Sequence, residues 1–179
     1  MTTRPKVLIV DDEPEVLALL VGDVEDLGFE VVQAANGRDA LDTLCVCQGS
    51  GAPVDAVVSD IKMPVMDGLS ALAEARKLGF RTPFIFLTGY ADKEKAIAAL
   101  KLGAIDFFEK PLDRRLMLES LRQAVSLGIE LRTLELELDD VMRMVPPGPP
   151  EEHERLRSAH REVLVLRKAH RAGLKKGKP

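Results

Sequence analysis

The chain has 179 residues, of which 46% are hydrophobic and 30% are charged, and its formal net charge is −4. This length is enough for one domain of ordinary size and an appendage. Aromatic residues make up only 4% and tryptophan is absent, so a base-stacking platform for single-stranded nucleic acid is not expected. No apolar run approaches about 18 residues and the first residues form no apolar signal region, so we expect a cytoplasmic protein without membrane insertion.

Strand and helix patterns alternate five times along the chain. The expected strands are 6–10, 29–34, 54–59, 83–87 and 105–109, and the expected helices are 14–27, 37–47, 67–78, 92–102 and a last helix from 113 onward. Gly28, Gly79 and Gly103 each follow a helical stretch, where a left-handed residue commonly ends a helix. The third and fourth strands are almost wholly apolar, which is typical of a parallel sheet covered by helices on both faces. The pattern predicts an α/β fold with a doubly wound, five-stranded parallel sheet.

Polar side chains stand where four of these strands end. Asp11 and Asp12 follow the first strand, Asp60 the third, Thr88 the fourth and Lys110 the fifth. The carboxyl ends of parallel strands meet at one edge of a sheet, where sites form. Three carboxylates there repel one another unless a cation lies among them, and ligands that are all oxygen favour Mg²⁺, with Mn²⁺ as an alternative. A lysine and a threonine beside that ion suit a phosphoryl group. The alternative is five unrelated polar residues at strand ends.

The two cysteines, Cys45 and Cys47, lie two positions apart in an expected helix and therefore point to different faces. A metal site would need further ligands nearby. We expect buried or half-buried structural thiols instead.

Three segments carry specific motifs: VLIVDDEPE at 7–15, VVSDIKMPVMDGL at 57–69 and FLTGYADKEKAIAALKLGAIDFFEKPLD at 86–113. With them, the stretch from about residue 5 to 125 resembles the receiver domain of bacterial two-component response regulators. The resemblance implies the flavodoxin-like strand order 2-1-3-4-5. It also implies a bond before Pro111 that the family usually keeps cis. None of the family's signature residues is missing.

The resemblance also implies a role for individual residues. Asp60 is then the phosphoacceptor, and Asp11 and Asp12 hold the metal together with Asp60. Lys110 and Thr88 bind the phosphoryl group, and Thr88 and Phe107 form the switch. Lys62 and Tyr90 tune hydrolysis of the acyl phosphate. The expected partner is a sensor histidine kinase or a phosphotransfer protein. Beyond its own phosphorylation and slow dephosphorylation, the chain is not expected to be an enzyme.

For two of these roles, the residue types themselves suggest an alternative or a consequence. Phe107 and the adjacent Phe108 are alternatively ordinary strand side chains, one on each face of the sheet, and for Phe108 this is the reading we adopt. Lys62 and Tyr90 are both bulky and are expected to crowd the approach of water to the acyl phosphate. A long-lived phosphoryl state follows.

A regular apolar pattern continues past the expected receiver. Its positions, spaced alternately by three and four residues, are Ala124, Leu127, Leu131, Leu134, Leu138, Val141 and Val145. This period of 3.5 indicates a coiled-coil seam, and the six positions from Leu127 onward predict a homodimer. A helix from 114 to 144 would be about 46 Å long, so its far half would project from the receiver. Gly128 weakens such a helix by about 1 kcal/mol relative to alanine and is expected to mark a flexible exit point. The alternative is a long helix that folds back on its own receiver.

The proline-rich stretch 146–150 should end that helix, and 151 to about 172 predicts another one. Residues 151–179 hold nine Lys or Arg against four Asp or Glu, so this tail is basic while the rest of the chain is acidic. The expected organisation is a receiver at 1–125, a coiled-coil extension at 126–145, a break at 146–150 and a basic helical tail at 151–179.

No Walker loop and no helix-turn-helix pattern can be read after the receiver. The sequence therefore predicts a phosphorylation-switched dimeric protein that signals through a helical surface to a downstream protein that it does not identify. One alternative is a DNA-binding transcription regulator that uses the basic last helix on DNA phosphates, although such tails are more often solvated. The other alternative is a receiver that only drains phosphoryl groups from a kinase.

Overall fold

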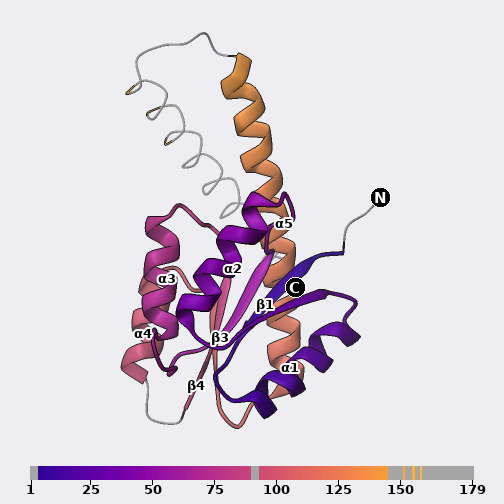
Figure 1. Ribbon diagram of the computed structural model, residues 1–179, viewed down its shortest axis with the longest axis vertical. Helices are drawn as coiled ribbons and strands as arrows, with labels where there is room; N and C mark the ends of the chain where they lie inside the picture. The colour runs from indigo at the N-terminus through magenta and orange to yellow at the C-terminus, as the bar shows by residue number, and fades with distance from the viewer. Residues whose placement is uncertain (1–3, 90–92, 145–150, 152–154, 156–157, 159–179) are drawn as a thin grey trace, which may run out of the picture. The chain divides into compact units, whose positions relative to one another are not determined.

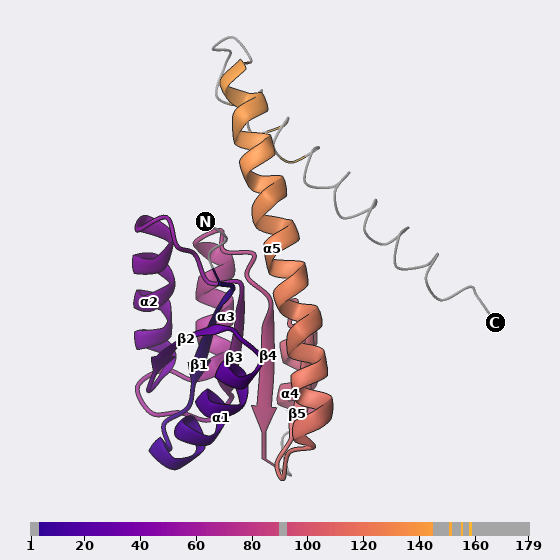
Figure 2. The ribbon, with the colours of Figure 1, turned by 90° about the vertical axis from the view of Figure 1, so that its right-hand side faces the viewer.

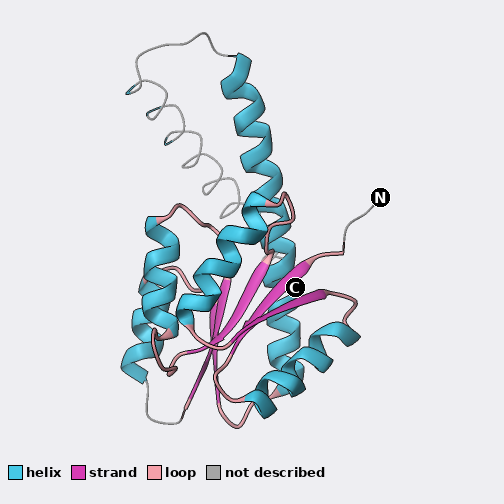
Figure 3. Ribbon diagram, in the orientation of Figure 1, coloured by secondary structure: helices cyan, strands magenta, loops and turns pink. Residues whose placement is uncertain are grey.

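The computed structural model describes residues 4–89, 93–144, 151, 155 and 158, and the chain divides into two compact units, residues 1–131 and 132–179. The strands are β1 (Lys6–Val10), β2 (Glu30–Ala34), β3 (Ala56–Asp60), β4 (Phe84–Thr88) and β5 (Asp106–Glu109). The helices are α1 (Pro14–Asp26), α2 (Gly37–Gly49), α3 (Gly68–Lys77), α4 (Lys93–Lys101) and α5 (Arg114–Met144) (Figures 1 and 3). The five predicted strands and the five predicted helices up to residue 144 are present, and their bounds differ from those predicted by at most two residues. The helix predicted from 151 to about 172 lies mostly outside the described residues.

The five strands form one parallel sheet in the order β2-β1-β3-β4-β5. This is the flavodoxin-like, doubly wound arrangement that the resemblance implied, and it is confirmed. Within the first unit, α2 and α3 lie on one side of the strands and α5 lies on the other (Figure 2).

Two apolar cores cover the two faces of the sheet. Alternate residues of a strand point to opposite faces, so Leu8 and Val57 pack with α2 and α3 while their neighbours Ile9 and Val58 pack with α1 and α5. Both β3 and β4 are buried along their whole length. This complete burial explains why the sequences of these two strands are almost wholly apolar.

Local chemistry explains several helix ends. The Oδ1 atom of Asn36 accepts hydrogen bonds from the backbone N–H groups of Arg38 and Asp39 and so caps α2. Gly28, Gly79 and Gly103 have φ values of 84°, 91° and 84°, as expected for left-handed residues that end helices. The Lys110–Pro111 bond is cis.

The course of α5 through Gly128 corrects one expectation. Gly128 was expected to mark a flexible exit point, but the helix continues through it and the residue is buried. A Cβ atom at this position would lie 1.8 Å from the backbone oxygen of Asp55. The glycine therefore serves close packing of the helix on the receiver.

The described seam positions differ in burial. Leu127, Leu131 and Leu134 are half-buried, and Leu138 is buried with an exposed fraction of 7%. The side chains of Val141 and Val145 lie outside the described residues, as do the predicted break at 146–150 and most of the tail at 151–179. The coiled coil and the dimer stay predictions.

Cys47 is buried, but Cys45 is exposed, so the expectation of a buried or half-buried thiol was wrong for Cys45. No helix among the described residues is long and apolar enough to cross a membrane.

Candidate functional site

The predicted site residues lie at the carboxyl edge of the sheet. Asp60 is the last residue of β3 and Thr88 the last residue of β4, while Asp11 and Asp12 directly follow β1 and Lys110 directly follows β5. Because these strands are parallel neighbours in one sheet, residues far apart in the chain reach the same edge.

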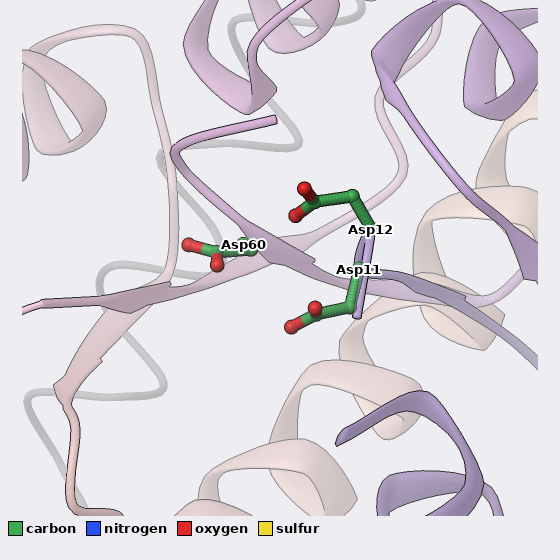
Figure 4. Close-up of side chains that lie close together, drawn as sticks. All are labelled: Asp11, Asp12 and Asp60. Atoms are coloured by element: carbon green, nitrogen blue, oxygen red, sulfur yellow. The ribbon is translucent and has the colours of Figure 1, made fainter. Parts of the chain in front are cut away.

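Three carboxylates share one space at this edge. One oxygen each of Asp11, Asp12 and Asp60 lies within 4.8 Å of the others, and Figure 4 shows the three side chains side by side. Asp11 is only 1% exposed and Asp60 8%, whereas Asp12 is exposed. Three negative charges this close repel one another. The donor set is all oxygen, with neither histidine nor cysteine in the cluster, and it fits a hard divalent cation.

Lys110 supplies positive charge to the same space. Its Nζ lies 2.9 Å from Oδ2 of Asp60 and 3.3 Å from Oδ2 of Asp11. Partial burial disfavours the ammonium, but the hydrogen bond and charge of Asp60, joined by Asp11, outweigh burial and raise the pKa of Lys110 above its ordinary 10.5. The side chain is therefore a fixed positive charge at neutral pH.

The environment of Asp11 disfavours the charge on its carboxylate. Burial raises the pKa of the Asp11 carboxyl above its ordinary 3.8, and the nearby charge of Asp60 adds to this. A hydrogen bond of 2.9 Å from the backbone N–H of Glu13 and the charge of Lys110 act in the opposite direction without cancelling it. A cation among the carboxylates would stabilise the ionised form of Asp11.

The carboxylate of Asp60 is held on both of its oxygens. Oδ1 accepts hydrogen bonds from the backbone N–H groups of Ile61 at 2.6 Å and Lys62 at 3.3 Å, and Oδ2 accepts from Lys110. The side chain therefore has one fixed orientation, with the lysine on one side and the loop after β3 on the other.

The proposed switch residues lie near this centre without joining the carboxylate cluster. Thr88 is buried, and its hydroxyl donates to the backbone oxygen of Gly89 at 3.2 Å. Phe107 is 39% exposed, whereas its neighbour Phe108 packs on the core that α1 and α5 share. The two phenylalanines thus differ as expected for opposite faces of β5. Lys62 is exposed in the loop after β3, and Tyr90 lies outside the described residues.

The packing role of two glycines beside the site was not predicted. A Cβ atom on Gly68 would lie 2.3 Å from the backbone oxygen of Asp60, and one on Gly37 would lie 2.8 Å from the backbone oxygen of Met66. Both glycines let the backbone around the loop after β3 pack closely. Gly68 stands in the motif at 57–69 that carries the family resemblance, whereas for Gly37 the only sequence signal was its place at the start of a predicted helix.

The chain is similar to proteins of a known family. The family described as the response regulator receiver domain matches residues 7–122. The regulatory protein AtoC of Escherichia coli (strain K12) is 39% identical over 138 residues, which cover 77% of this chain and 28% of AtoC. The response regulator protein PilR of Pseudomonas aeruginosa is 33% identical over 149 residues, which cover 83% of this chain and 32% of PilR. The chain spans less than a third of the length of these two relatives.

Solved structures agree with the sequence relatives. The signal receiver domain of an HD domain-containing protein from Pseudomonas fluorescens Pf-5 has a TM-score of 0.65 and 30% identity, and the match covers 74% of this chain and 95% of that one. A response regulator receiver domain protein from Clostridium thermocellum has a TM-score of 0.60 and 30% identity, covering 73% of this chain and 98% of that one. The sheet order, the carboxylates at its edge and the match to the family over residues 7–122 lead to one conclusion. The chain belongs to the response regulator receiver domain family.

Proposed function

We propose that this protein is a phosphorylation-switched response regulator that accepts a phosphoryl group on Asp60 from a histidine kinase or a phosphotransfer protein. The observation that carries the proposal is the carboxylate of Asp60, which is 8% exposed, held by two backbone N–H groups, and paired at 2.9 Å with the ammonium of Lys110. A nucleophile with a fixed orientation and an adjacent positive charge is what phosphoryl transfer requires.

The proposed reaction is a direct transfer of the phosphoryl group between two side chains. An oxygen of the Asp60 carboxylate attacks the phosphorus of a phosphohistidine in the partner, so that a P–O bond forms and the P–N bond breaks. The bonding electron pair returns to the imidazole nitrogen. The imidazole leaves as a neutral ring when its other nitrogen is protonated, and otherwise takes up a proton from solvent. Both reactants are anionic and repel one another, and Lys110 offsets this repulsion as a point charge. No acid or base of the receiver is needed. In this proposal the group that is modified is the receiver's own Asp60, so the protein acts only on itself and is not an enzyme.

Asp11, Asp12 and Asp60 would together hold Mg²⁺, or Mn²⁺ in its place. When bound, the cation neutralises charge on the oxygens of the transferring group. The support is the all-oxygen donor set within 4.8 Å and the raised pKa of Asp11.

The switch is proposed to work through Thr88 and Phe107. The Thr88 hydroxyl, which now donates to Gly89, would turn to a phosphoryl oxygen, and the half-exposed Phe107 would move inward. The changed surface would comprise α4, β5 and α5. Lys62 and Tyr90 would then limit the access of water to the acyl phosphate.

The output is proposed to be a helical surface that includes the apolar seam of α5 and pairs two copies of the chain. A second candidate is control of transcription, because one relative is named transcriptional regulatory protein AruR, of Pseudomonas aeruginosa, which is 36% identical over 115 residues. The chain spans 47% of AruR, so this output is a proposal. Binding of random duplex DNA that weakens steeply with salt would favour the second candidate.

The decisive assay is uptake of labelled phosphate from a small phosphodonor such as acetyl phosphate. We expect labelling of the wild-type chain in the presence of Mg²⁺, and none in excess chelator or in Asp60→Asn. Labelling that persists in Asp60→Asn would show that another residue is the acceptor.

A further inference from the structure

The loop after β3 contains a strained residue five positions after Asp60. Val65 has a φ of 64° and is the one non-glycine residue with positive φ among those that the structure describes. β-branched residues rarely adopt this conformation. The backbone N–H of Met66 donates to the carbonyl of Pro64 at 2.7 Å, so Val65 is the centre of a tight three-residue turn. Its side chain is 85% exposed, and packing of that side chain therefore does not explain the strain.

The turn is fixed from the side of α2. The backbone N–H of Gly37, the first residue of that helix, donates to the carbonyl of Met66 at 2.9 Å. Gly37 is buried, and a Cβ atom there would lie 2.8 Å from the same Met66 oxygen and 2.9 Å from the backbone oxygen of Asp67. Glycine thus allows the end of the helix to touch the loop.

The other end of the loop is fixed on β3 itself. The backbone N–H of Gly68 donates to the carbonyl of Ile61 at 3.0 Å, and Gly68 packs against the backbone of Asp60. Ile61, which holds Gly68, and the next residue Lys62 donate their N–H groups to Oδ1 of Asp60. Only Met63 and Pro64 separate Lys62 from the turn at Val65. A movement of the turn at Val65 would therefore move the donors that orient the nucleophile.

Strained backbone persists only where the surrounding structure imposes it, and it is concentrated at functional sites. We propose that the turn at Val65, together with its support Gly37, positions the amides of Ile61 and Lys62 on Asp60 for phosphoryl transfer. The inference rests on the proposed function of Asp60. It assigns Val65 and Gly37 as positioning residues, since neither is expected to touch the phosphoryl group.

The first test is Val65→Gly. This substitution removes the strain and frees the turn, but it removes no packed side chain, so the melting temperature should be unchanged or higher. The initial rate of phosphate uptake from acetyl phosphate should nevertheless fall on the order of tenfold, because misplacement of a reacting group by about 1 Å can cost about a hundredfold. The matched control is Val65→Ile, which keeps the β-branch and should keep the wild-type rate.

The second test is Gly37→Ala, which pushes the Met66 carbonyl away. Its uptake rate should also fall, whereas Gly49→Ala in the same helix, where an added Cβ has no atom within 4 Å, should have the wild-type rate. Rates are compared at saturating Mg²⁺ and at a temperature at which circular dichroism shows each variant fully folded. A purely structural role would lower the melting temperature and leave the rate of the folded molecule unchanged.

The outcomes separate the two proposals. A lower rate in Val65→Gly with an undiminished melting temperature supports the inference. A wild-type rate in Val65→Gly overturns it, while labelling that still depends on Asp60 leaves the proposed function intact. If Gly37→Ala does not fold, Val65→Gly decides alone. Absence of Asp60-dependent labelling in the wild-type chain overturns both.

Discussion

Gly128 of α5 packs directly on the backbone of Asp55, the residue before β3, so that an added Cβ would be 1.8 Å from the Asp55 oxygen and 2.7 Å from its carbonyl carbon. Asp55 in turn is joined to β1, since its N–H donates to the carbonyl of Lys6 and its Oδ2 accepts from the N–H of Lys6, both at 2.8 Å. The beginnings of β1 and β3 and the helix α5 thus meet at one point. That point is at the opposite end of β3 from Asp60.

Substitution Gly128→Ala should therefore destabilise the receiver. Alanine normally favours a helix by about 1 kcal/mol over glycine, but here its methyl group has no space and the helix or β3 must shift. We expect a net loss of about 1–3 kcal/mol in the free energy of unfolding, measured by urea denaturation. Gly22→Ala in α1, where an added Cβ has no neighbour within 4 Å, is the control and should be neutral or stabilising. A stabilised Gly128→Ala would contradict the described packing.

The pH dependence of stability should report on Asp11. Its pKa in the folded state lies above 3.8, so ionisation of this carboxyl disfavours folding. The penalty is complete above the folded-state pKa and disappears below 3.8, where both states hold the proton. In solution free of divalent cations, Asp11→Asn should therefore unfold at a higher temperature than wild type at pH 7, with no such gain below pH 3.8.

Addition of Mg²⁺ provides the second arm of that experiment. The cation should raise the melting temperature of wild type more than that of Asp11→Asn, because the variant lacks one ligand. Asp42→Asn, which changes an exposed carboxylate of α2, is the control and should respond to Mg²⁺ as wild type does. An equal response of Asp11→Asn would show that Asp11 is not a ligand.

Thr88→Ala should separate phosphorylation from its readout. The variant keeps Asp60, the other carboxylates and Lys110, so it should take up phosphate at a rate close to that of wild type. It lacks the hydroxyl that would bind the phosphoryl group, so the change that phosphorylation causes in hydrogen exchange of α4 and β5 should be smaller. Loss of phosphorylation itself would instead place Thr88 among the groups needed for transfer.

Association should depend on the seam of α5. Burial of each apolar position contributes roughly 1.5–3 kcal/mol before the entropy of association is subtracted. By sedimentation we expect a dimer for the whole chain and folded monomers for Leu131→Asp/Leu138→Asp. A truncation after Leu131, where the first compact unit ends, should also be a folded monomer. Truncation near Ala124 would remove Gly128 and is therefore unsuitable.

A monomeric whole chain at micromolar concentration would contradict the dimer. Leu138 is buried in the single chain, with an exposed fraction of only 7%. A monomer would therefore mean that the chain covers its own seam. Leu136→Asp is the matched control for the double variant, because Leu136 is 62% exposed and lies off the seam.

The sequence was sufficient to predict the parallel sheet and the edge at which the site lies. Apolar runs that end in Asp11, Asp60 and Thr88 identify both the buried strands and their carboxyl ends. Because sites in parallel sheets form at those carboxyl ends, the same pattern also locates the site. The long α5 was also predicted, since its apolar spacing does not depend on tertiary contacts.

Features that depend on close packing between distant segments were missed. Gly128 looked like a weak point of a helix, because helix propensity does not register the approach of Asp55 from 73 positions earlier in the chain. The support that Gly37 gives to Met66 and the positive φ of Val65 were missed for the same reason: neither residue type indicates them. The exposure of Cys45 depends on how α2 is rotated on the sheet, which the two cysteines alone do not determine.

The central claim is that Asp60 is the residue that becomes phosphorylated, and the most direct measurement is chemical mapping of the acceptor. The chain is phosphorylated with acetyl phosphate and Mg²⁺, reduced with borohydride, which converts an acyl phosphate of aspartate to homoserine, and sequenced by mass spectrometry of its peptides. The account predicts homoserine at position 60, and at no other carboxylate of the cluster. Homoserine at Asp11 or Asp12, or a phosphoryl group found only on a histidine, would contradict it.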